Sequence, residues 1–438
     1  MNIAVVGGGA AGLAAAWTLA NAGAAVTLFE RAAQVGGRAR SEALDGCVVD
    51  TGAQLFGSGF SAVFRLARAI GAEQLLVHSP GKDAVYRNGR MHPITYGSVS
   101  SMVKSHALPT TLKLKLGARY VPLLLRHGRH LDASDPLAAG GDALDTSSVT
   151  EWGRRELGND FLELLAYPLL GAYYGVAPEN MSVAVYHALA KAGLDVSVYA
   201  VRGGTGALMR ALADAAVARG AEIRLEAEVT RVEDTGSSVC VYQGEHTDVF
   251  DAVILALPAP HVPVLAADLP VELRDWLAGV QYVPSAVLAL VLDKPLNADF
   301  FGLSLLRDHT ELRALVAICV AAHKAPGLVP PDKGLLICLG SPMENASLVQ
   351  NGEASVERMV ATVEQVFPGT SSHIERAKLY RHVEGYPVFY PGYLKHLRRF
   401  PAAALPPRLQ LAGDYLVSPT VEGAFRSGER AAQALLRR

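Results

Sequence analysis

The chain opens with an apolar run, a glycine-rich turn and a second apolar run, an order that predicts a strand, a helix and a strand. Residues 2–6, NIAVV, are typical of a strand buried on both faces of a parallel sheet. The alanine-rich stretch after the turn predicts a helix that ends near Gly23, and residues 25–30, AVTLFE, predict the second strand. Together they form a βαβ unit.

The next part of the chain is mostly helical in pattern. Apolar spacing predicts a helix over residues 53–70, and DAVYRNGRMHPI predicts a hairpin that turns at Asn88 and Gly89. Residues 98–200 also have mostly helical spacing. We therefore expect a helical region between the first βαβ unit and the second half of the chain.

Strand and helix patterns alternate again in the second half. A helix is predicted over 207–220, a half-buried strand over 223–229 and a buried strand within 251–258. Three apolar runs between residues 285 and 340, SAVLALVLD, ALVAICVAA and GLLICLG, predict a second, antiparallel sheet. The chain closes with LQLAGDYL, a predicted strand, and a final helix.

Strand–helix units at the start, middle and end predict a mixed α/β fold in which two domains are interleaved. One is a Rossmann-like nucleotide-binding domain, and the other combines a mostly antiparallel sheet with a helical part. The expected pieces are 1–97, 201–262 and 401–438 for the nucleotide-binding domain, 98–200 for the helical part and 263–400 for the second sheet.

Composition narrows the class of protein. The 438 residues suffice for two cores, and a net charge of −2 gives no reason to expect nucleic-acid binding. The four cysteines lack C-x-x-C spacing, so we expect no metal site and a reducing compartment. The first predicted strand leaves no room for a signal peptide, and no apolar stretch is long enough to span a bilayer. We expect a cytoplasmic protein.

Three glycines in the first turn, Gly7, Gly9 and Gly12, match the G-x-G-x-x-G pattern of dinucleotide-binding proteins. The first permits a tight turn, the second lets a diphosphate approach the backbone, and the third lets helix and strand pack closely. Glu30 ends the second strand, where a carboxylate can accept hydrogen bonds from ribose hydroxyls.

A second glycine pair, Gly36 and Gly37, is followed directly by Arg38. A simple nicotinamide dehydrogenase does not need this pair. A long, buried dinucleotide does, because its diphosphate needs a cation and its chain needs close backbone approach. Arg38 and Arg40 are the candidate cations, since a guanidinium matches phosphate oxygens.

The run GGGAAG…FERAAQVGGR resembles the FAD-binding start of the superfamily of amine oxidases, protoporphyrinogen oxidases and phytoene desaturases. LAGDYLVSPTVEGAF, near the C-terminus, resembles its closing signature. The resemblance implies a non-covalent FAD, because the late region GYPVFYPGYLKHLRRF has no cysteine for attachment. It also implies that Asp414 binds a ribityl or diphosphate oxygen and that Gly423 and Ala424 present backbone N–H groups to the flavin ring. The implied FAD contacts are Gly7, Gly9, Ala10, Ala11, Gly12, Glu30, Arg31, Gly36, Gly37, Arg38, Gly52, Ala53, Val229, Leu257, Gly413, Asp414, Val421, Glu422, Gly423 and Ala424.

The segment from Ser148 to Ser182 resembles the protoporphyrinogen oxidase branch. The resemblance implies an FAD-dependent oxidase or desaturase that moves hydride to flavin N5 from a C–H next to nitrogen or in a reduced pyrrole or conjugated system. A C=N or C=C bond results, with O₂ or a quinone as acceptor. Two alternatives stay open: an oxidase of a cyclic or secondary amine, and a flavin-bearing isomerase or cyclase without net redox chemistry.

The expected substrate is a small molecule, and no single catalytic acid or base stands out. The candidate substrate contacts are Gln54, Phe56, Tyr174, Tyr386, Phe389 and Tyr390. Residues 103–131 mix lysines and arginines with leucines. That pattern is typical either of helices packed on the core or of a face that touches anionic lipid. The sequence does not indicate an oligomeric state.

Overall fold

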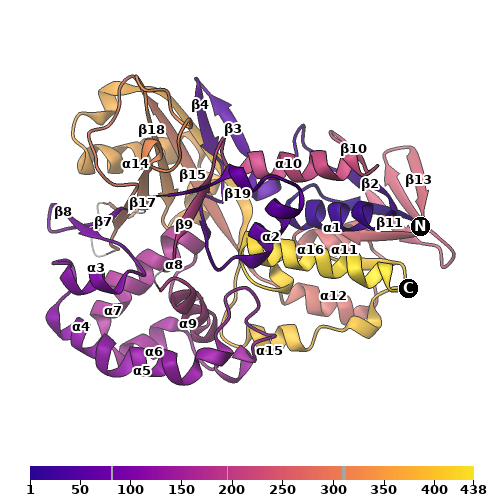
Figure 1. The fold of residues 1–438 in the computed structure, drawn as a ribbon, viewed down its shortest axis with the longest axis horizontal. Helices are drawn as coiled ribbons and strands as arrows, with labels where there is room; N and C mark the ends of the chain where they lie inside the picture. The colour runs from indigo at the N-terminus through magenta and orange to yellow at the C-terminus, as the bar shows by residue number, and fades with distance from the viewer. Residues whose placement is uncertain (80–81, 195, 308–311) are drawn as a thin grey trace.

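The computed structural model describes residues 1–79, 82–194, 196–307 and 312–438, and it has a nucleotide-binding part and a second part built from a sheet and helices (Figure 1). A five-stranded parallel sheet with the order β10-β2-β1-β14-β20 forms the centre of the first part. Its strands are β1 (Asn2–Val6), β2 (Ala25–Phe29), β10 (Glu222–Arg224), β14 (Ala252–Leu255) and β20 (Leu409–Leu411).

Both faces of this sheet are covered, which explains why its strands are apolar throughout. Helices α1 (Ala10–Asn21), α10 (Thr205–Ala218) and α16 (Val421–Leu436) share one hydrophobic cluster with Ile3, Val5 and Leu28. The antiparallel strands β11 (Arg231–Asp234), β12 (Val239–Gln243) and β13 (His246–Phe250) cover the other face, where Phe250 packs edge-on against Phe29.

A seven-stranded sheet with the order β19-β15-β18-β17-β16-β7-β8 forms the centre of the second part. Its strands are β7 (Asp83–Arg87), β8 (Arg90–Ile94), β15 (Tyr282–Leu292), β16 (Gly302–Leu305), β17 (Leu315–Val320), β18 (Gly334–Gly340) and β19 (Ile374–Pro387). Neighbours are antiparallel except β16 and β7, which are parallel. Helices α13 (Asn345–Gln350) and α14 (Gly352–Val366) pack against this sheet.

The remaining helices form a separate layer at the lower left of Figure 1, and α8 connects it to the seven-stranded sheet. They are α3 (Val99–Lys104), α4 (Thr110–Lys115), α5 (Val121–His127), α6 (Val149–Glu156), α7 (Asn159–Phe161), α8 (Tyr167–Tyr174) and α9 (Val183–Ala192). Outside these layers, the described part of the chain forms four further α-helices and five short strands: α2 (Ser61–Ala69), α11 (Val262–Leu265), α12 (Val271–Ala278), α15 (Tyr393–Arg398), β3 (Ser41–Leu44), β4 (Cys47–Asp50), β5 (Phe56–Gly57), β6 (Leu76–His78) and β9 (Val198–Val201).

The mixed α/β class and the hairpin turn are confirmed, since Asn88 and Gly89 both have positive φ, 52° and 72°. Two local predictions are wrong. The helix predicted over 53–70 begins only at Ser61, because the preceding residues pair with β9 as β5. The strand predicted over 223–229 ends at Arg224, because Glu226 has a φ of +53°.

Pairing between strands that are distant in the sequence also changes which residues belong to the nucleotide-binding part and which to the second part. The sequence assigns residues 1–97 to the nucleotide-binding domain, whereas β7 and β8 lie in the seven-stranded sheet, where β7 pairs with β16. Strand β19 was not predicted. It is an edge strand that exposes charged side chains such as Arg376, Lys378 and Arg381, so its sequence lacks the continuous apolar pattern of its neighbours.

Candidate functional site

The glycine turn after β1 leaves open space above the first turn of α1, which Ala10 and Ala11 form. Gly7 has a φ of +105°, and a Cβ there would lie 2.5 Å from the carbonyl oxygen just after β14. A Cβ on Gly12 would lie 1.9 Å from the Gly7 oxygen, whereas a Cβ on Gly9 would meet nothing within 4 Å. No side chain caps the N-terminus of α1. Its free N–H groups and the space at Gly9 fit a diphosphate.

Glu30 shapes the far side of this turn. Its Oε2 accepts a hydrogen bond from Gly8 N at 2.7 Å and its Oε1 one from Ala32 N at 2.9 Å. A carboxylate has about four acceptor positions, so two remain for ribose hydroxyls. The Arg31 side chain is exposed beside it.

Val229 and Leu257 approach the same turn from other segments. Val229 is 8% exposed and lies in the loop between β10 and β11, where Ala227 N donates to Glu30 O at 2.9 Å. The Cδ2 atom of Leu257 would lie 3.1 Å from a Cβ on Gly7. Both residues therefore lie near the turn and Glu30, and their contact with FAD stays a prediction.

The two glycine segments lie against each other. Gly36 N donates to Gly8 O at 2.8 Å, and Gly9 and Gly36 form an isolated parallel bridge. Gly36 and Gly37 have φ values of 117° and 53°, and a Cβ on Gly37 would lie 3.2 Å from Gly9 Cα. The second glycine pair therefore forms one wall of the space above the first glycine turn. We call this space, between Gly7–Gly12 and Gly36–Gly37, the cradle.

Arg38 joins this cradle to the C-terminal signature. Its Nη2 lies 3.0 Å from Asp414 Oδ1, and its Nη1 donates to Gly385 O at 2.9 Å. Burial alone would lower the pKa of Arg38, but the neighbouring Asp414 carboxylate outweighs burial and raises that pKa. Gly413 N, next to Asp414, donates to Ser427 Oγ at 2.9 Å. Residues from both ends of the chain thus meet at one charged pair.

The N-terminus of α16 differs from what the resemblance implies. Thr420 caps this helix: its Oγ1 accepts from Gly423 N at 3.0 Å, and its backbone oxygen accepts from Ala424 N at 3.0 Å. Both N–H groups expected to face the flavin are therefore used within the cap. Of the first-turn N–H groups, those of Val421 and Glu422 make no hydrogen bond to the described part of the chain.

The Glu422 side chain has a structural role. It is fully buried, and its carboxylate accepts hydrogen bonds from Ala62 N and Val63 N at 2.8–3.0 Å and pairs with Arg426 at 2.7 Å. A carboxylate at a helix N-terminus is favourable, and here it caps α2. Any contact of Glu422 with a cofactor would thus come from its backbone.

The turn after β4 lies directly beside Arg38. A Cβ on Gly52 would lie 2.2 Å from Arg38 O, and Ala53 N donates to that oxygen at 3.0 Å. Gly52 and Ala53 therefore belong to the cradle, as expected. Only glycine fits at position 52, because the backbone of residue 38 occupies the space of a side chain.

Gln54, expected to touch substrate, instead braces this turn. Its Nε2 donates to Asp50 O at 2.9 Å and Gly52 O at 3.1 Å, and its Oε1 accepts from Lys324 Nζ at 2.6 Å. Lys324 also pairs with the Asp50 carboxylate at 2.5 Å, and both side chains are 2% exposed. Lys324 is not predictable from the sequence, because a single lysine in a loop carries no pattern.

Tyr174 and Tyr386 lie together next to the cradle. A Cβ on Gly175, which follows Tyr174 at the end of α8, would lie 2.2 Å from the Tyr386 ring. Burial raises the pKa of Tyr386, while the nearby Arg38 charge lowers it. Both tyrosines are half-buried. The structure thus brings these two candidate substrate contacts together near Arg38.

Of the other three aromatic candidates, Phe56 and Phe389 belong to the packed interior, whereas Tyr390 is half-buried. Phe56 and Phe389 are 1% and 0% exposed, so neither has surface left for a ligand. Phe389 packs on Tyr393 with ring centroids 4.5 Å apart, and Tyr390 OH donates to Gly279 O at 3.1 Å. The prediction that Phe56 and Phe389 bind substrate is wrong in this structure, because the hydrophobic core encloses both rings.

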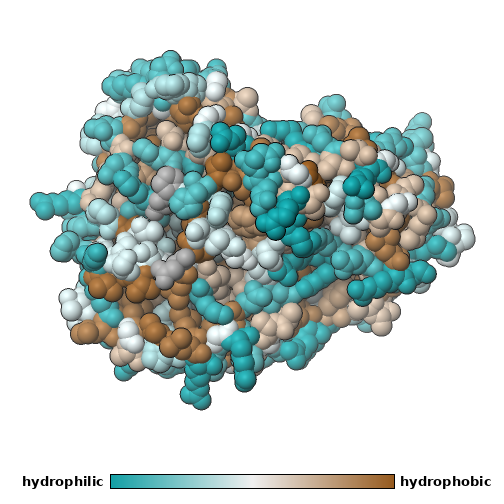
Figure 2. All heavy atoms as spheres, in the orientation of Figure 1, coloured by the Kyte–Doolittle hydropathy of each residue, from teal (hydrophilic) through white to brown (hydrophobic). Residues whose placement is uncertain are grey.

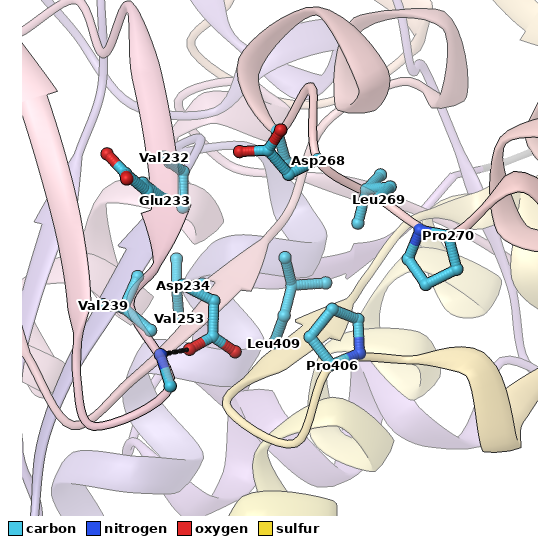
Figure 3. Close-up of a pocket in the computed structure, with 12 residues that line it drawn as sticks. Val232, Glu233, Asp234, Val239, Val253, Asp268, Leu269, Pro270, Pro406 and Leu409 are labelled. Atoms are coloured by element: carbon cyan, nitrogen blue, oxygen red, sulfur yellow. Dashed lines mark hydrogen bonds between the residues drawn. The ribbon is translucent and has the colours of Figure 1, made fainter.

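A separate pocket of about 320 Å³ opens at the surface of the nucleotide-binding part (Figure 3). Its walls are β11, β12, the loop before α12 and the segment before β20. They carry apolar side chains such as Leu269 and Leu409 and the carboxylates of Glu233, Asp234 and Asp268. No predicted site residue lines this pocket.

Comparisons with known proteins agree with the cradle. The family model described as "Flavin containing amine oxidoreductase" matches residues 10–436. Coproporphyrinogen III oxidase from Staphylococcus aureus is 28% identical over 42% of this chain and 38% of its own length, so the match spans less than half of that relative. Coproporphyrinogen III oxidase from Mycobacterium leprae is 25% identical over 98% of this chain and 97% of its own length.

A solved structure shows the same fold. Cyclohexylamine oxidase from Brevibacterium oxydans superposes with a TM-score of 0.76 at 18% identity, covering 100% of this chain and 99% of that chain. The expected superfamily and its FAD cofactor are therefore confirmed. With a double-glycine cradle, an arginine–aspartate closure and a family match over nearly its whole length, this chain belongs to the flavin-containing amine oxidoreductases.

Proposed function

We propose that this protein is an FAD-dependent oxidase that removes hydride from a C–H bond next to nitrogen or within a reduced pyrrole system. The observation that carries the proposal is the Arg38–Asp414 pair, which closes the glycine cradle next to Tyr386. Bound FAD would supply the two-electron acceptor. The family match supports an oxidoreductase of this kind.

The chain's own share in this reaction is binding and orientation. The N-terminus of α1 and the space at Gly9 would hold the diphosphate, and Glu30 the adenosine ribose. The first-turn N–H groups of Val421 and Glu422 would favour negative charge on a neighbouring ring. Tyr174 and Tyr386 would hold a planar substrate in a dry space, which orients the reacting C–H.

Within this reaction we propose a substrate like that of the protoporphyrinogen oxidase branch, with O₂ as acceptor. Matches to two coproporphyrinogen III oxidases support it. The second candidate is a cyclic or secondary amine, and the fold shared with cyclohexylamine oxidase is compatible with it. A flavin-bearing isomerase or cyclase is the alternative from another class.

Anaerobic mixing tests the proposal. The FAD-loaded protein is mixed with porphyrinogens and with cyclic and secondary amines, and flavin absorbance near its visible maximum is followed. We expect one of these classes to bleach the flavin, and admission of air to restore the absorbance with release of peroxide. A substrate that is converted without any bleaching would contradict the oxidase and support the isomerase or cyclase.

We also propose that residues 103–131 touch anionic lipid. Val103, Leu114 and Leu125 expose 60%, 69% and 79% of their surface, and Figure 2 shows hydrophobic side chains gathered where Figure 1 places α4 and α5. Lys104 and Arg126 lie exposed in the same segment. No helix in the described ranges has the length and apolarity to cross a bilayer, so the contact would be peripheral.

Liposome flotation tests this contact. With vesicles that contain phosphatidylglycerol, we expect the wild-type protein to float and the double variant Leu114→Gln, Leu125→Gln to stay behind. High salt should weaken the binding, because the lysines and arginines contribute to it. If the wild-type protein does not float, the segment is a solvent-exposed helical face.

A further inference from the structure

A half-buried carboxylate, Asp83, lies on the seven-stranded sheet away from the cofactor cradle. Asp83 opens β7 and is paired in register with Gly302 of β16, which is paired in turn with Cys319 of β17. Residues paired in this way point to the same face of a sheet. A Cβ on Gly302 would lie 2.7 Å from Asp83 Oδ1, so the carboxylate lies directly over this glycine.

Two tyrosines surround the carboxylate. The Tyr173 hydroxyl, at the end of α8, lies close enough to Asp83 to lower the pKa of that carboxyl, and Tyr96 lies beside Asp83 and Ser304. Tyr173 keeps 39% of its surface accessible although burial raises its pKa well above the ordinary tyrosine value. A ring that is accessible and yet shielded from bulk water lines an interior space, so Asp83 faces that space.

No cation neutralises Asp83 within the described ranges. The salt bridges of those ranges do not include it, and Lys324, a buried cation whose charge acts on Cys319, is paired with Asp50. Burial raises the pKa of Asp83 to about 7, against the lowering effect of the Gly302 N–H and Tyr173. A carboxylate that is only partly hydrated and has no cation beside it is costly, and such groups are typical of functional sites.

The same helix end connects Asp83 to the proposed substrate contacts. Tyr173 and Tyr174 are consecutive, and Gly175 lies against the ring of Tyr386, which is near Arg38. A substrate that lies along the end of α8 would therefore reach from the cradle to Asp83.

We propose that Asp83 is a subsite for a protonated amine carried by the substrate. This rests on the proposed function in one respect, because the interior space beside α8 is taken to be the substrate's. Asp83 would supply the counter-charge that an ammonium needs, and the rings of Tyr96 and Tyr173 lie beside that charge. The same charge repels carboxylates, so of the two candidate substrates this subsite favours the cyclic or secondary amine over a porphyrinogen, whose side chains end in carboxylates.

Equilibrium binding to the FAD-loaded protein tests the subsite without turnover. Cumylamine has no hydrogen on its nitrogen-bearing carbon and cannot lose hydride there, and cumyl alcohol is its uncharged counterpart. At pH 8 we expect calorimetry to show that the amine binds about tenfold more tightly than the alcohol, the range of one charge-assisted hydrogen bond. Asp83→Asn should remove this preference and leave the affinity for the alcohol unchanged.

Two further variants make the result specific. Gly302→Ala should also reduce the preference, because the new Cβ displaces the carboxylate, whereas Asp275→Asn, an exposed change of the same charge on α12, should keep it. The FAD content of each variant is measured first. Equal affinity for amine and alcohol in the wild type, or an unchanged preference in Asp83→Asn, would overturn the proposal.

The pH dependence gives an independent check. The preference should fall from pH 8 to pH 6 as Asp83 takes up a proton, and Asp83→Asn should show no such change. Tyr96, Tyr173 and Cys319 stay neutral over this range, since burial raises the pKa of each thiol or phenol. His92 of β8, on the same sheet face, is retained in the variant. If the protein prefers the amine over the alcohol but no substrate bleaches the flavin, the result supports the subsite and contradicts the proposed function.

Discussion

At the scale of single residues, the role of a buried charged side chain depends on its neighbours in space more than on the sequence motif to which it belongs. Glu422 belongs to a recognisable signature, yet its carboxylate caps α2 and cannot face a ligand. Asp50 and Lys324 form an almost fully buried pair that also holds Gln54, and Asp50 Oδ1 accepts from Thr205 N at 2.7 Å. Sequence patterns report which residue types occur, but the role of a charge depends on what lies opposite it.

Replacing Lys324 tests this pair. Lys324→Met leaves Asp50 buried without a cation, and we expect the free energy of unfolding to fall by about 3–5 kcal/mol. Adding Asp50→Asn should recover part of that loss, because the pair is then neutral. Urea unfolding of the FAD-loaded variants gives the values, with Lys333→Met, at an exposed pair with Glu375, as the control. A loss no larger than that of the control would show that the pair does not stabilise the fold.

At the scale of elements, glycines set how closely helices approach. Helices α1 and α16 come from opposite ends of the chain and pack side by side (Figure 1). A Cβ on Gly428 of α16 would lie 2.0 Å from Ala11 O, so α16 touches the backbone of α1 itself. This contact places the first turns of both helices, and with them the two halves of the cradle.

Gly428→Ala tests the contact. Alanine usually stabilises a helix relative to glycine, but here the added Cβ has to push α16 away from α1. We expect a loss of about 1–3 kcal/mol in the free energy of unfolding, with weaker FAD binding. Gly117→Ala is the matched control, since a Cβ there meets nothing within 4 Å, and it should be neutral or stabilising by about 0.5–1 kcal/mol. The same effect from both substitutions would refute close helix packing at Gly428.

At the scale of the whole molecule, the cradle is assembled from distant segments. Arg38 contacts Asp414 near the C-terminus and Gly385 in the long strand β19, so it connects the nucleotide-binding part to the seven-stranded sheet. FAD bound there would join all three segments and stabilise the folded state by mass action.

Arg38→Met tests this assembly. Loss of the guanidinium leaves Asp414 unpaired beside the diphosphate, so we expect FAD to bind the stripped protein at least about tenfold more weakly. Arg40→Met, which removes the other candidate cation and its 3.5 Å pair with Glu42, should change the affinity little. Flavin fluorescence on titration measures both. If Arg40→Met has the larger effect, the diphosphate cation is Arg40.

The sequence by itself determined the βαβ start, the interleaved α/β architecture, the glycine cradle and, by resemblance, its cofactor. These follow from local rules: glycine permits backbone approach, apolar runs mark buried strands, and a carboxylate ends the second strand. The tertiary structure alone decided which charged and aromatic side chains are engaged inside the protein. The side chains of Gln54, Glu422 and Phe389, which the sequence places among the ligand contacts, stabilise the fold instead. Asp83 and Lys324 lie in segments that carry no motif, so only the structure draws attention to them. The reason is physical, since the free energy of a charge or an aromatic ring depends on its neighbours in space, and those neighbours come from distant parts of the chain.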